Sequence, residues 1–392
     1  MKILYYSPHP HLKLKDPTGY GTHMREMIHA FRKRNNEVLP VIMGGVNGSI
    51  EKPREVKSNR GKKKYIPKPL WELAKDFNLL LFDRNARKVL KQKVDQFKPD
   101  VIYERSNYLQ TSGVEVAREL NIPHILEVNS PHIIEREILT GTRSPLKRYF
   151  KKIEKKQFKK TTKIAVVSST LRDFINKEYE IELDKIVVVP NGIDVNKIKV
   201  SETEKQQLIV KYNLNNNHVI GFVGSVHPWH RVDMLIEAFS DIVQSRGGVK
   251  LLIVGGGSMI ARLTELCRKL NIEDNVIFTG KIPNVDVYKY ISVMDITVIP
   301  GTKWFMMPVK LFEYGALGKP VIAIDTQAIR DVMVDGEEGL LFKSDKRALT
   351  ESLSELINDE EKRTEYGINF KRKVMKQYTW ENNAKYVLEQ II

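Results

Sequence analysis

Short apolar runs recur along the chain, separated by amphipathic or polar stretches. In the first half they occupy residues 3–6, 38–43, 101–103, 124–128, 164–167 and 186–189. A second series occupies residues 219–224, 251–254, 276–278, 296–299, 321–324 and 339–342. Short buried strands that alternate with helices are typical of a parallel sheet covered by helices on both faces. The pattern predicts an α/β protein with two Rossmann-like, doubly wound parallel sheets.

The two series meet at the turn Val189-Pro-Asn-Gly-Ile-Asp194. We therefore expect an N-terminal domain over residues 1–195 and a C-terminal domain over residues 196–370, which suits a chain of 392 residues. Residues 371–392 are predicted to be helical and to pack back on the N-terminal domain. In open α/β sheets ligands bind beyond the carboxyl ends of the strands, so the cleft shared by two such domains is the expected active site.

The segment that begins at Pro308 has the features of a diphosphate-binding helix. Proline suits the first helical turn, and the open amides there, at Val309 and Lys310, favour an anion. Glu313 follows just over one turn later, where its carboxylate could accept hydrogen bonds from ribose hydroxyls. The alternative interpretation is an ordinary amphipathic helix with a solvated glutamate.

Two further loops of the second half follow predicted strands. After residues 219–224, the loop Gly224-Ser225-Val-His-Pro-Trp-His230-Arg231 is rich in groups that can carry positive charge, so His230 and Arg231 are candidate diphosphate ligands. A loop whose histidines are only structural is the alternative, and zinc is not expected because no cysteine or acidic ligand keeps a regular spacing. Backbone groups at Gly280, Lys281 and Ile282 could contact a nucleobase.

The first half contributes two candidate sites. Gly19 and Gly21 precede a predicted helix over residues 23–33 and allow close backbone approach to an acceptor or a diphosphate, although a plain turn would also use them. Asn129 and His132 follow the fourth predicted strand and are expected to face the cleft. A structural histidine and a loop-capping asparagine are the alternatives.

The net charge and the distribution of basic residues indicate which kinds of partner the protein can bind. The net charge of +16 predicts attraction to phosphates, and residues 143–163 hold ten Lys or Arg against the single acid Glu154. A second basic block covers residues 52–68. Both blocks include aromatic residues, which is consistent with an anionic membrane surface, although a solvated helix face is the alternative.

The lone Cys267 excludes a disulfide framework, and no apolar run is long enough for a membrane span. We expect a cytoplasmic protein that can attach peripherally to the inner face of the plasma membrane.

Taken together, the motifs resemble those of GT-B-fold glycosyltransferases of family 4, a retaining group that uses nucleotide-activated sugars. The segments that carry the resemblance keep the family's order and spacing: residues 19–21, 188–194, 222–224, 232–233, 253–257, 276–280, 295–300 and 308–323. The resemblance implies a GT-B architecture of two Rossmann-like domains facing a cleft, with a C-terminal helix that crosses back.

The resemblance also implies roles for single residues. Glu313 matches the second Glu of the family's Glu-x7-Glu motif, which binds the ribose, whereas Phe305 replaces the first. Ser225 and His230 replace the Arg and Lys that neutralise the diphosphate. A protonated His230, together with Arg231 or Lys310, could supply the missing charge.

Near the reacting carbon, Asn129 occupies the position of the family's histidine, and His132 is a displaced substitute.

The expected function is therefore transfer of a sugar from a UDP- or GDP-sugar to a hydroxyl of a glycan or lipid-linked acceptor, with retention of configuration. The pathway expected is the synthesis of cell-envelope polysaccharide or glycolipid. No cofactor or metal is expected, consistent with the lack of an Asp-x-Asp sequence. A degenerate nucleotide-sugar-binding scaffold is one alternative. A nucleic-acid-binding α/β protein is another, but no RNA- or DNA-binding module pattern supports it.

Overall fold

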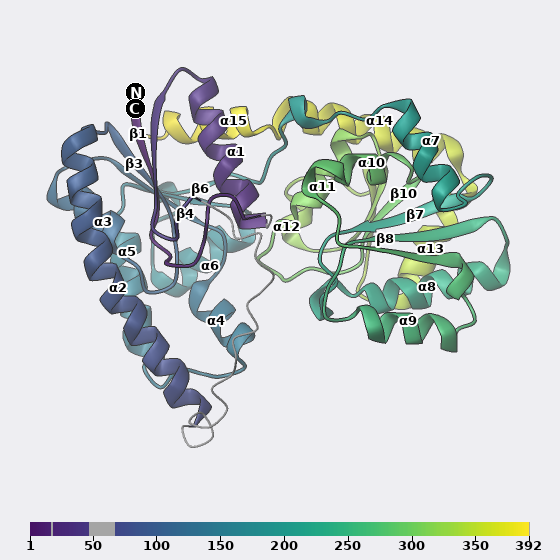
Figure 1. Ribbon diagram of the computed structural model, residues 1–392, viewed down its shortest axis with the longest axis horizontal. Coiled ribbons are helices and arrows are strands. Elements are labelled where there is room, and N and C mark those ends of the chain that lie inside the picture. The colour runs from purple at the N-terminus through teal and green to yellow at the C-terminus, as the bar shows by residue number, and fades with distance from the viewer. Residues whose placement is uncertain (17–18, 47–66, 392) are drawn as a thin grey trace. The chain divides into compact units, whose positions relative to one another are not determined.

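The computed structural model describes residues 1–16, 19–46 and 67–391. It consists of two compact units, one formed by Met1–Val189 with Asn383–Ile392 and the other by Pro190–Asn382. Each unit has its own sheet and its own core (Figure 1). Most of the predicted basic block at 52–68 lies outside the described residues.

The first unit is built on a six-stranded, all-parallel sheet with the order β2-β1-β3-β4-β5-β6. Its strands are β1 (Lys2–Ser7), β2 (Glu37–Ile42), β3 (Val101–Arg105), β4 (His124–Val128), β5 (Lys163–Val166) and β6 (Ile186–Val188). Ile3 is in register with Val38 on one side and Val101 on the other. The chain therefore reverses its direction of travel across the sheet between β1 and β3.

Helices cover this first sheet (Figure 1). They are α1 (Gly19–Lys33), α2 (Lys68–Phe97), α3 (Ser112–Glu119), α4 (His132–Thr140), α5 (Lys147–Lys160) and α6 (Ser169–Tyr179), with most of α15 (Trp380–Glu389). The central strands are buried on both faces, and their side chains, such as Leu4, Tyr6 and Ile102, pack against Val94 of α2 and Val116 of α3. Continuous apolar strands are what a sheet covered on both faces requires.

The second unit repeats the plan with the strand order β12-β11-β10-β7-β8-β9. All of its ladders between strands are parallel. The strands are β7 (His218–Val223), β8 (Val249–Val254), β9 (Val276–Gly280), β10 (Ile296–Ile299), β11 (Val321–Ile324) and β12 (Gly339–Phe342). The reversal falls between β7 and β10, the position at which doubly wound sheets bind ligands.

The second sheet is covered by helices of very different lengths. They are α7 (Glu202–Lys211), α8 (Val232–Ser245), α9 (Ile260–Lys269), α10 (Val287–Ser292), α11 (Val309–Ala316), α12 (Gln327–Arg330), α13 (Lys346–Asn358) and α14 (Glu360–Gln377). Short 3-10 turns occur at Leu183–Lys185, Val195–Lys197, Pro228–His230, Glu273–Asn275 and Asn284–Asp286. Local sequence fixes several helix starts: Ser201 and Glu204, for example, form a reciprocal capping box at the start of α7.

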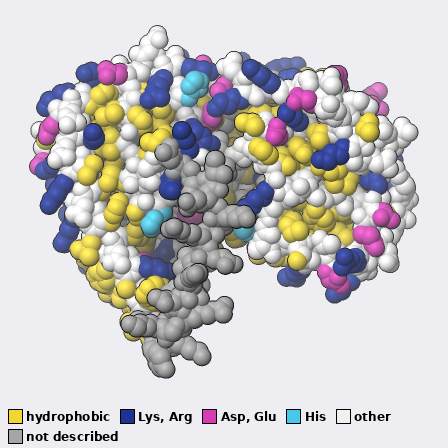
Figure 2. All heavy atoms as spheres, viewed as in Figure 1, with side chains coloured by type: hydrophobic (Ala, Val, Ile, Leu, Met, Phe, Trp, Pro, Cys, Tyr) yellow, Lys and Arg dark blue, Asp and Glu magenta, His cyan; other side chains and the backbone are white. Residues whose placement is uncertain are grey.

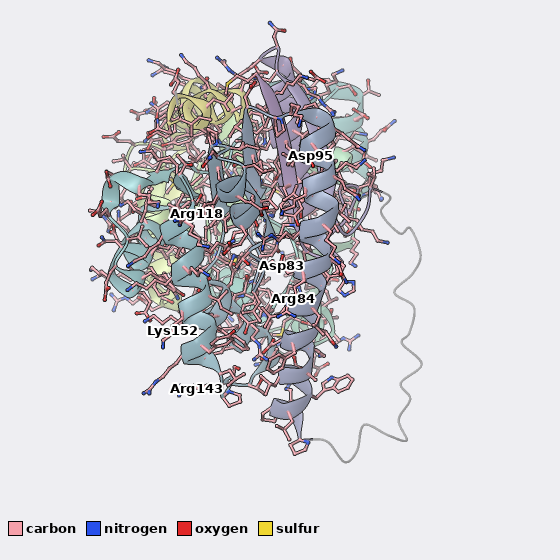
Figure 3. The ribbon with its side chains drawn as sticks, turned by 90° about the vertical axis from the view of Figure 1, so that its left-hand side faces the viewer. Asp83, Arg84, Asp95, Arg118, Arg143 and Lys152 are labelled. Carbon is pink, nitrogen blue, oxygen red and sulfur yellow. The ribbon has the colours of Figure 1, made fainter. Side chains whose placement is uncertain are left out.

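Helix α2 is unusual because its buried side carries carboxylates. Glu72, Asp76 and Asp83 are all at least nine-tenths buried. Asp83 accepts hydrogen bonds from the Thr111 and Ser112 amides at the start of α3, at 2.8 and 3.2 Å, and Figure 3 shows it on the length of α2. Asp76 accepts two hydrogen bonds from Arg136, at 3.1 and 2.7 Å. The first half of the helix therefore lacks the usual apolar stripe, which is confined to Ala86, Leu90 and Val94, so periodicity does not reveal the whole helix.

Candidate functional site

The site in the second unit is built where β7 and β10 end. Gly224, the first residue after β7, has a φ of +132°, and Gly255, the first after β8, has a φ of +137°. A Cβ on Gly255 would lie 2.0 Å from the Gly224 carbonyl oxygen. Further on, the Val226 amide donates to the Gly256 carbonyl at 3.0 Å. The glycines are therefore needed for two loops to run in contact along the sheet edge.

Helix α11 begins directly after this edge. Pro308 has a φ of −73° and a ψ of 124°, so it precedes the helix as its cap, and Val309 is the first helical residue. The prediction that Pro308 lies within the first turn was therefore one residue early. No side chain caps the helix start, which leaves first-turn amides open to a ligand. On the other side, Asn191 donates to the Met307 carbonyl at 2.8 Å and holds the approach to the helix in place.

The Lys310 side chain is a buried cationic group of this site. The residue is 8% exposed, and its Nζ has no hydrogen-bond partner among the described residues. Nζ lies 3.9 Å from the centre of the Phe222 ring. Burial lowers the pKa of Lys310 to about 7, although the Glu313 carboxyl opposes that shift. The sequence indicated the Lys310 amide as a phosphate ligand and its side chain as one possible source of the missing charge; the structure shows that this amine is buried.

Glu313 lies one turn further along α11 and has intermediate exposure. Burial raises its pKa to about 7, and Lys310 opposes the shift. The next residue, Tyr314, is fully buried and accepts a hydrogen bond from the Val223 amide at 2.8 Å through its hydroxyl. This bond fixes α11 against the end of β7, so the Glu313 carboxyl and the loop after β7 keep a defined spacing.

His230 is buried in the same place, with its ring centre 5.8 Å from that of Phe222. Burial, followed by the nearby Lys310, lowers the pKa of His230 to about 3. The imidazole is therefore neutral in the free protein, which corrects the expectation of a protonated His230. Its Nδ1 is buried without a hydrogen-bond partner among the described residues.

The remaining predicted ligands of the loop are more exposed. Arg231 has a left-handed φ of +50°, and its Nε lies 3.7 Å from Asp233. Ser225 is exposed. Lys303, which the sequence analysis did not consider, lies over the Trp229 ring at 4.5 Å.

Gly280 ends β9, two strands away from β7, and has a φ of +70°. It forms an isolated antiparallel bridge with Gly255, which brings the Gly280–Ile282 segment to the same edge of the sheet. The Lys281 side chain is exposed and its stem lies against Gly256, whereas Ile282 is half-buried. The structure thus places all three predicted nucleobase-contacting residues beside the glycine loops.

Phe305, which replaces the first Glu of the Glu-x7-Glu motif, is fully buried. The Trp304 ring packs edge-on against it with a centroid separation of 5.3 Å. Position 305 is therefore part of the core of the second unit rather than an open polar position.

In the first unit, the predicted glycine turn is already helical. Helix α1 begins at Gly19, four residues earlier than expected, so Gly19 and Gly21 form its first turn. A Cβ on Gly21 would lie 2.2 Å from the Asp16 carbonyl oxygen, and Arg25 donates to that oxygen at 2.9 Å. Gly21 is thus required for the close approach of the preceding loop to α1.

Asn129 and His132 lie beside a buried polar cluster at the end of β4. The Asn129 amide donates to Glu127 at 2.5 Å, and Arg105 donates to the same carboxylate oxygen at 2.6 Å. The Glu127 carboxylate is held ionised: despite its burial, His23 and Arg105 lower its pKa.

The imidazole of His132 hydrogen-bonds to Ser106 at 2.8 Å and to Ser130 at 3.3 Å. Burial, with a contribution from Arg105, lowers the pKa of His132 to about 4, so this ring is neutral.

Sequence reasoning missed Arg105, Glu127 and His23 as members of this cluster. His23 Nδ1 lies 3.4 Å from the Glu127 carboxylate, although the two residues are about a hundred positions apart. The available signal was a charged residue at the end of each of two predicted apolar strands, because the ends of neighbouring parallel strands meet at one edge.

Comparison with protein families identifies both units. Residues 17–197 match the model described as Glycosyltransferase Family 4, and residues 204–373 match the model described as Glycosyl transferases group 1. The chain belongs to these glycosyltransferases. Each model covers most of one structural unit, so the expectation of family membership is confirmed for both halves.

Individual relatives of this glycosyltransferase are distant. The uncharacterized glycosyltransferase MJ1069 of Methanocaldococcus jannaschii is 25% identical over 239 residues, which are 60% of this chain and 60% of the relative. The capsular polysaccharide biosynthesis glycosyltransferase CapM of Staphylococcus aureus is 29% identical over 236 residues, or 56% of this chain and 60% of CapM. These matches therefore span about three-fifths of each relative.

Among solved structures, Anabaena Alr3699/HepE in complex with UDP superposes with a TM-score of 0.74 at 16% identity, covering 99% of both chains. With the two six-stranded parallel sheets, this similarity confirms the two-domain, Rossmann-like GT-B fold.

Over residues 1–16, 19–46 and 67–391, no group of three or more His, Cys, Asp or Glu side chains could hold a metal ion. Over the same ranges, no helix is both long and apolar enough to cross a membrane.

Proposed function

We propose that this glycosyltransferase moves a sugar from a nucleoside-diphosphate donor, a UDP- or GDP-sugar, to a hydroxyl group of its acceptor. The observation that carries the proposal is the start of α11. Within residues 309–313 this helix start presents uncapped backbone amides, the unpartnered Lys310 amine and the Glu313 carboxyl. The amides and the amine suit a diphosphate, and the carboxyl suits the ribose hydroxyls. Alr3699/HepE, which shares the fold, was crystallised with UDP.

The proposed chemistry follows from where negative charge develops. Cleavage between the anomeric carbon and the phosphate oxygen leaves a growing negative charge on the diphosphate, and donors aimed at that charge lower the barrier. In this chain the α11 amides and the loop after β7 provide them. We propose retention of configuration, with the acceptor hydroxyl attacking from the side of the leaving group and a diphosphate oxygen removing its proton. We further propose that activity does not require an added metal ion.

Calorimetric titration of the protein with UDP and GDP in parallel tests the donor site. Selective micromolar binding of one nucleotide would support the proposal and fix the base. Binding of neither would leave α11 as an ordinary helix and overturn it. Anomeric analysis of the product by NMR tests retention, and assay in EDTA tests independence from metal.

We propose that the acceptor meets the first unit near Asn129 and His132, and that it is a glycan or lipid-linked intermediate of cell-envelope polysaccharide or glycolipid synthesis. CapM is named for capsular polysaccharide biosynthesis. The neutral His132 can accept or donate a hydrogen bond without adding charge. The buried Phe305 favours one competing function, a nucleotide-sugar-binding scaffold without activity. Donor binding without transfer to any of a broad acceptor panel would support that alternative.

We also propose that the first unit attaches to an anionic membrane surface. Exposed apolar side chains cluster on the first turns of α2 and at the end of α4: Leu70, Trp71, Phe77, Leu81, Ile138 and Leu139. Figure 2 shows hydrophobic and basic side chains mixed on the visible face of this unit.

The basic residues of the membrane proposal lie on and before α5, where Figure 3 shows Arg143 and Lys152 on the same side of the unit as Arg84 of α2. Arg143, Arg148 and Lys152 have no carboxylate partner among the described residues. Other basic residues of α5 are paired with carboxylates; Lys151, for example, forms an ion pair with Glu178. The aromatic contribution is smaller than expected, because Phe150 and Phe158 are buried and, of the α5 aromatics, Tyr149 is exposed.

Sedimentation with phosphatidylglycerol vesicles tests the membrane proposal. R148Q/K152Q should weaken binding by about 2 kcal/mol at low salt, since each basic residue near an anionic leaflet contributes about 1 kcal/mol. F77S/L81S should weaken binding even at higher salt, and I368S, which alters an exposed apolar residue of the second unit, should not. Equal sedimentation of all these variants, or none for the wild type, would contradict the proposal.

A further inference from the structure

The Lys310 ammonium group is buried over the Phe222 ring, and no hydrogen-bond acceptor of the described residues contacts it. Its Nζ is enclosed by the Phe222 ring, 3.9 Å away, and by the Gly224 backbone, where an added Cβ would lie 2.8 Å from Nζ. No hydrogen bond or ion pair reaches Nζ from the described residues. Buried ammonium groups are normally paired, because an isolated buried charge is strongly disfavoured. An unpaired ammonium group in the first turn of α11 therefore indicates a binding site for a ligand.

The surroundings of Nζ indicate that this ligand is an anion. The uncapped first turn of α11 presents backbone amides, and the buried Nδ1 of His230 has no hydrogen-bond partner among the described residues. His230 and Lys310 are close enough for the lysine to lower the pKa of the imidazole. A negative group placed here would pair with Lys310 and would also offset the repulsion between Lys310 and His230, whose pKa is lowered mainly by burial.

Other cations of the region are engaged or exposed. The Arg231 guanidinium lies 3.7 Å from Asp233 and contacts the Met234 sulfur. Lys303 lies over the Trp229 ring at 4.5 Å. Lys281 is exposed on the edge next to Gly256. Lys310 is therefore the cation that is both desolvated and unpaired.

We propose that the Lys310 side chain, rather than His230 or Arg231, is the cation that binds the donor diphosphate, and that the protein takes up a proton when the diphosphate binds. This inference rests on the proposed function and names the group that replaces the family's missing basic pair. The bound anion converts Lys310 from a partly deprotonated amine to a fully protonated ammonium. The proton comes from the buffer acid: one N–H bond forms on Lys310, one bond to hydrogen breaks in the buffer, and no other covalent bond changes.

The sign of the pH dependence follows from the groups that face Lys310. From α11, Glu313 favours its charged form, and from the turn before α8, His230 is neutral. The pKa of Lys310 is about 7 in the free protein and rises when the anion binds. Binding is therefore strongest below pH 7, and the dissociation constant increases by about tenfold per pH unit above it.

Proton uptake is measured on the wild-type protein by titrating UDP, and GDP in parallel, at pH 8 in two buffers with different ionisation enthalpies. About nine-tenths of Lys310 is deprotonated at that pH if its pKa is about 7, so uptake should approach one proton per nucleotide. E313Q separates the contribution of the neighbouring carboxyl, and most of the uptake should remain in that variant. A dissociation constant that does not change between pH 6.5 and 8.5 would overturn the inference.

The variant K310M removes the amine and keeps the length of the side chain. It should weaken nucleotide binding by about 10- to 100-fold, the usual effect of losing a charge-assisted hydrogen bond, and abolish the proton uptake. K319M is the matched control, because Lys319 is a second partly desolvated lysine of this unit but already donates to the Ser292 carbonyl at 2.9 Å. Its nucleotide affinity should stay within about twofold of the wild type.

Thermal unfolding distinguishes a binding lysine from a structural one. Removal of an unpaired buried amine should leave the melting temperature of K310M unchanged or raise it, whereas loss of a structural contact would lower it. If the wild type binds UDP or GDP but K310M binds it equally well, this inference fails and the proposed function stands. If the wild type binds neither nucleotide, the proposed function itself fails.

Discussion

Substitution of Phe305 by glutamate would restore the family's first carboxylate, yet we expect it to destabilise the second unit. The Phe305 ring is fully buried against Trp304. A carboxylate placed there would lose its hydration and would have to be protonated in the folded state. F305L is the matched control, because it removes a similar part of the ring without adding a polar group.

The expected size follows from the cost of holding that carboxyl protonated. A glutamate with an ordinary pKa of about 4.3 that stays neutral at pH 7 costs about 3.7 kcal/mol, at 1.36 kcal/mol per pH unit. F305E should therefore be less stable than F305L by about that amount, which corresponds to roughly 7–15 °C in melting temperature for a unit of this size. Because the folded-state pKa is raised, the penalty is present above pH 4.3 and shrinks as the pH falls. At pH 5 it should be about 1 kcal/mol.

Differential scanning calorimetry of F305E and F305L at pH 5, 6 and 7 measures this difference directly. The two melting temperatures should converge toward pH 5. Equal melting temperatures at every pH would show that a carboxylate at position 305 reaches solvent. The interpretation of Phe305 as a core residue would then be wrong, and an increase in sugar transfer by F305E would place the side chain at the donor.

Two further predictions concern buried features of the separate units. D76N should lower the free energy of unfolding in urea by about 3–5 kcal/mol, because it leaves the buried Arg136 without its carboxylate partner. The double variant D76L/R136M should recover most of this loss. Equal losses in the single and double variants would contradict a desolvated ion pair. G255A should destabilise the second unit by about 2 kcal/mol or more and weaken nucleotide binding, because its Cβ would meet the Gly224 carbonyl, whereas G247A, with no atom within 4 Å of its Cβ, should behave like the wild type.

The strands of this protein could be predicted from the sequence within a few residues, and the reason is their burial. Strands such as Ile296–Ile299 and Val321–Ile324 lie inside a covered sheet, so their side chains are buried on both faces and all but Thr297 are apolar. The glycines that follow β7 and β8 were also informative, because the crossing of two loops there excludes any Cβ.

Helix α2 could not be predicted in the same way. In its first half the buried face carries Glu72, Asp76 and Asp83 and the exposed face carries residues such as Phe77 and Leu81, so the usual periodicity is reversed there. The carboxylates are satisfied by partners far along the chain, and no local pattern announces such long-range contacts. The helix start at Gly19 was not predicted because glycine has a low intrinsic helix propensity.

The candidate site was predictable in position but not in electrostatics. The sequence places His230 after one predicted strand and Lys310 and Glu313 after another, and the resemblance suggests their roles. Whether an imidazole is charged depends on burial and on its neighbours, and these shift the pKa of His230 far below its ordinary value. Likewise, only the three-dimensional structure shows that the Lys310 amine is buried without a hydrogen-bond partner among the described residues.

The departures from the family's motif leave the summed charge of the proposed donor site unchanged. The resemblance implies two carboxylates and two cations around the donor, which sum to zero. In this chain Phe305 removes one carboxylate, while Ser225 and the neutral His230 remove both cations. In the proposed donor site a single cation then balances Glu313, and we propose that the buried Lys310 supplies it. Had Lys310 been apolar, the Glu313 carboxylate would face a dianionic diphosphate with only backbone dipoles to offset the repulsion. The loss of one acid and the presence of one buried lysine are therefore parts of the same arrangement.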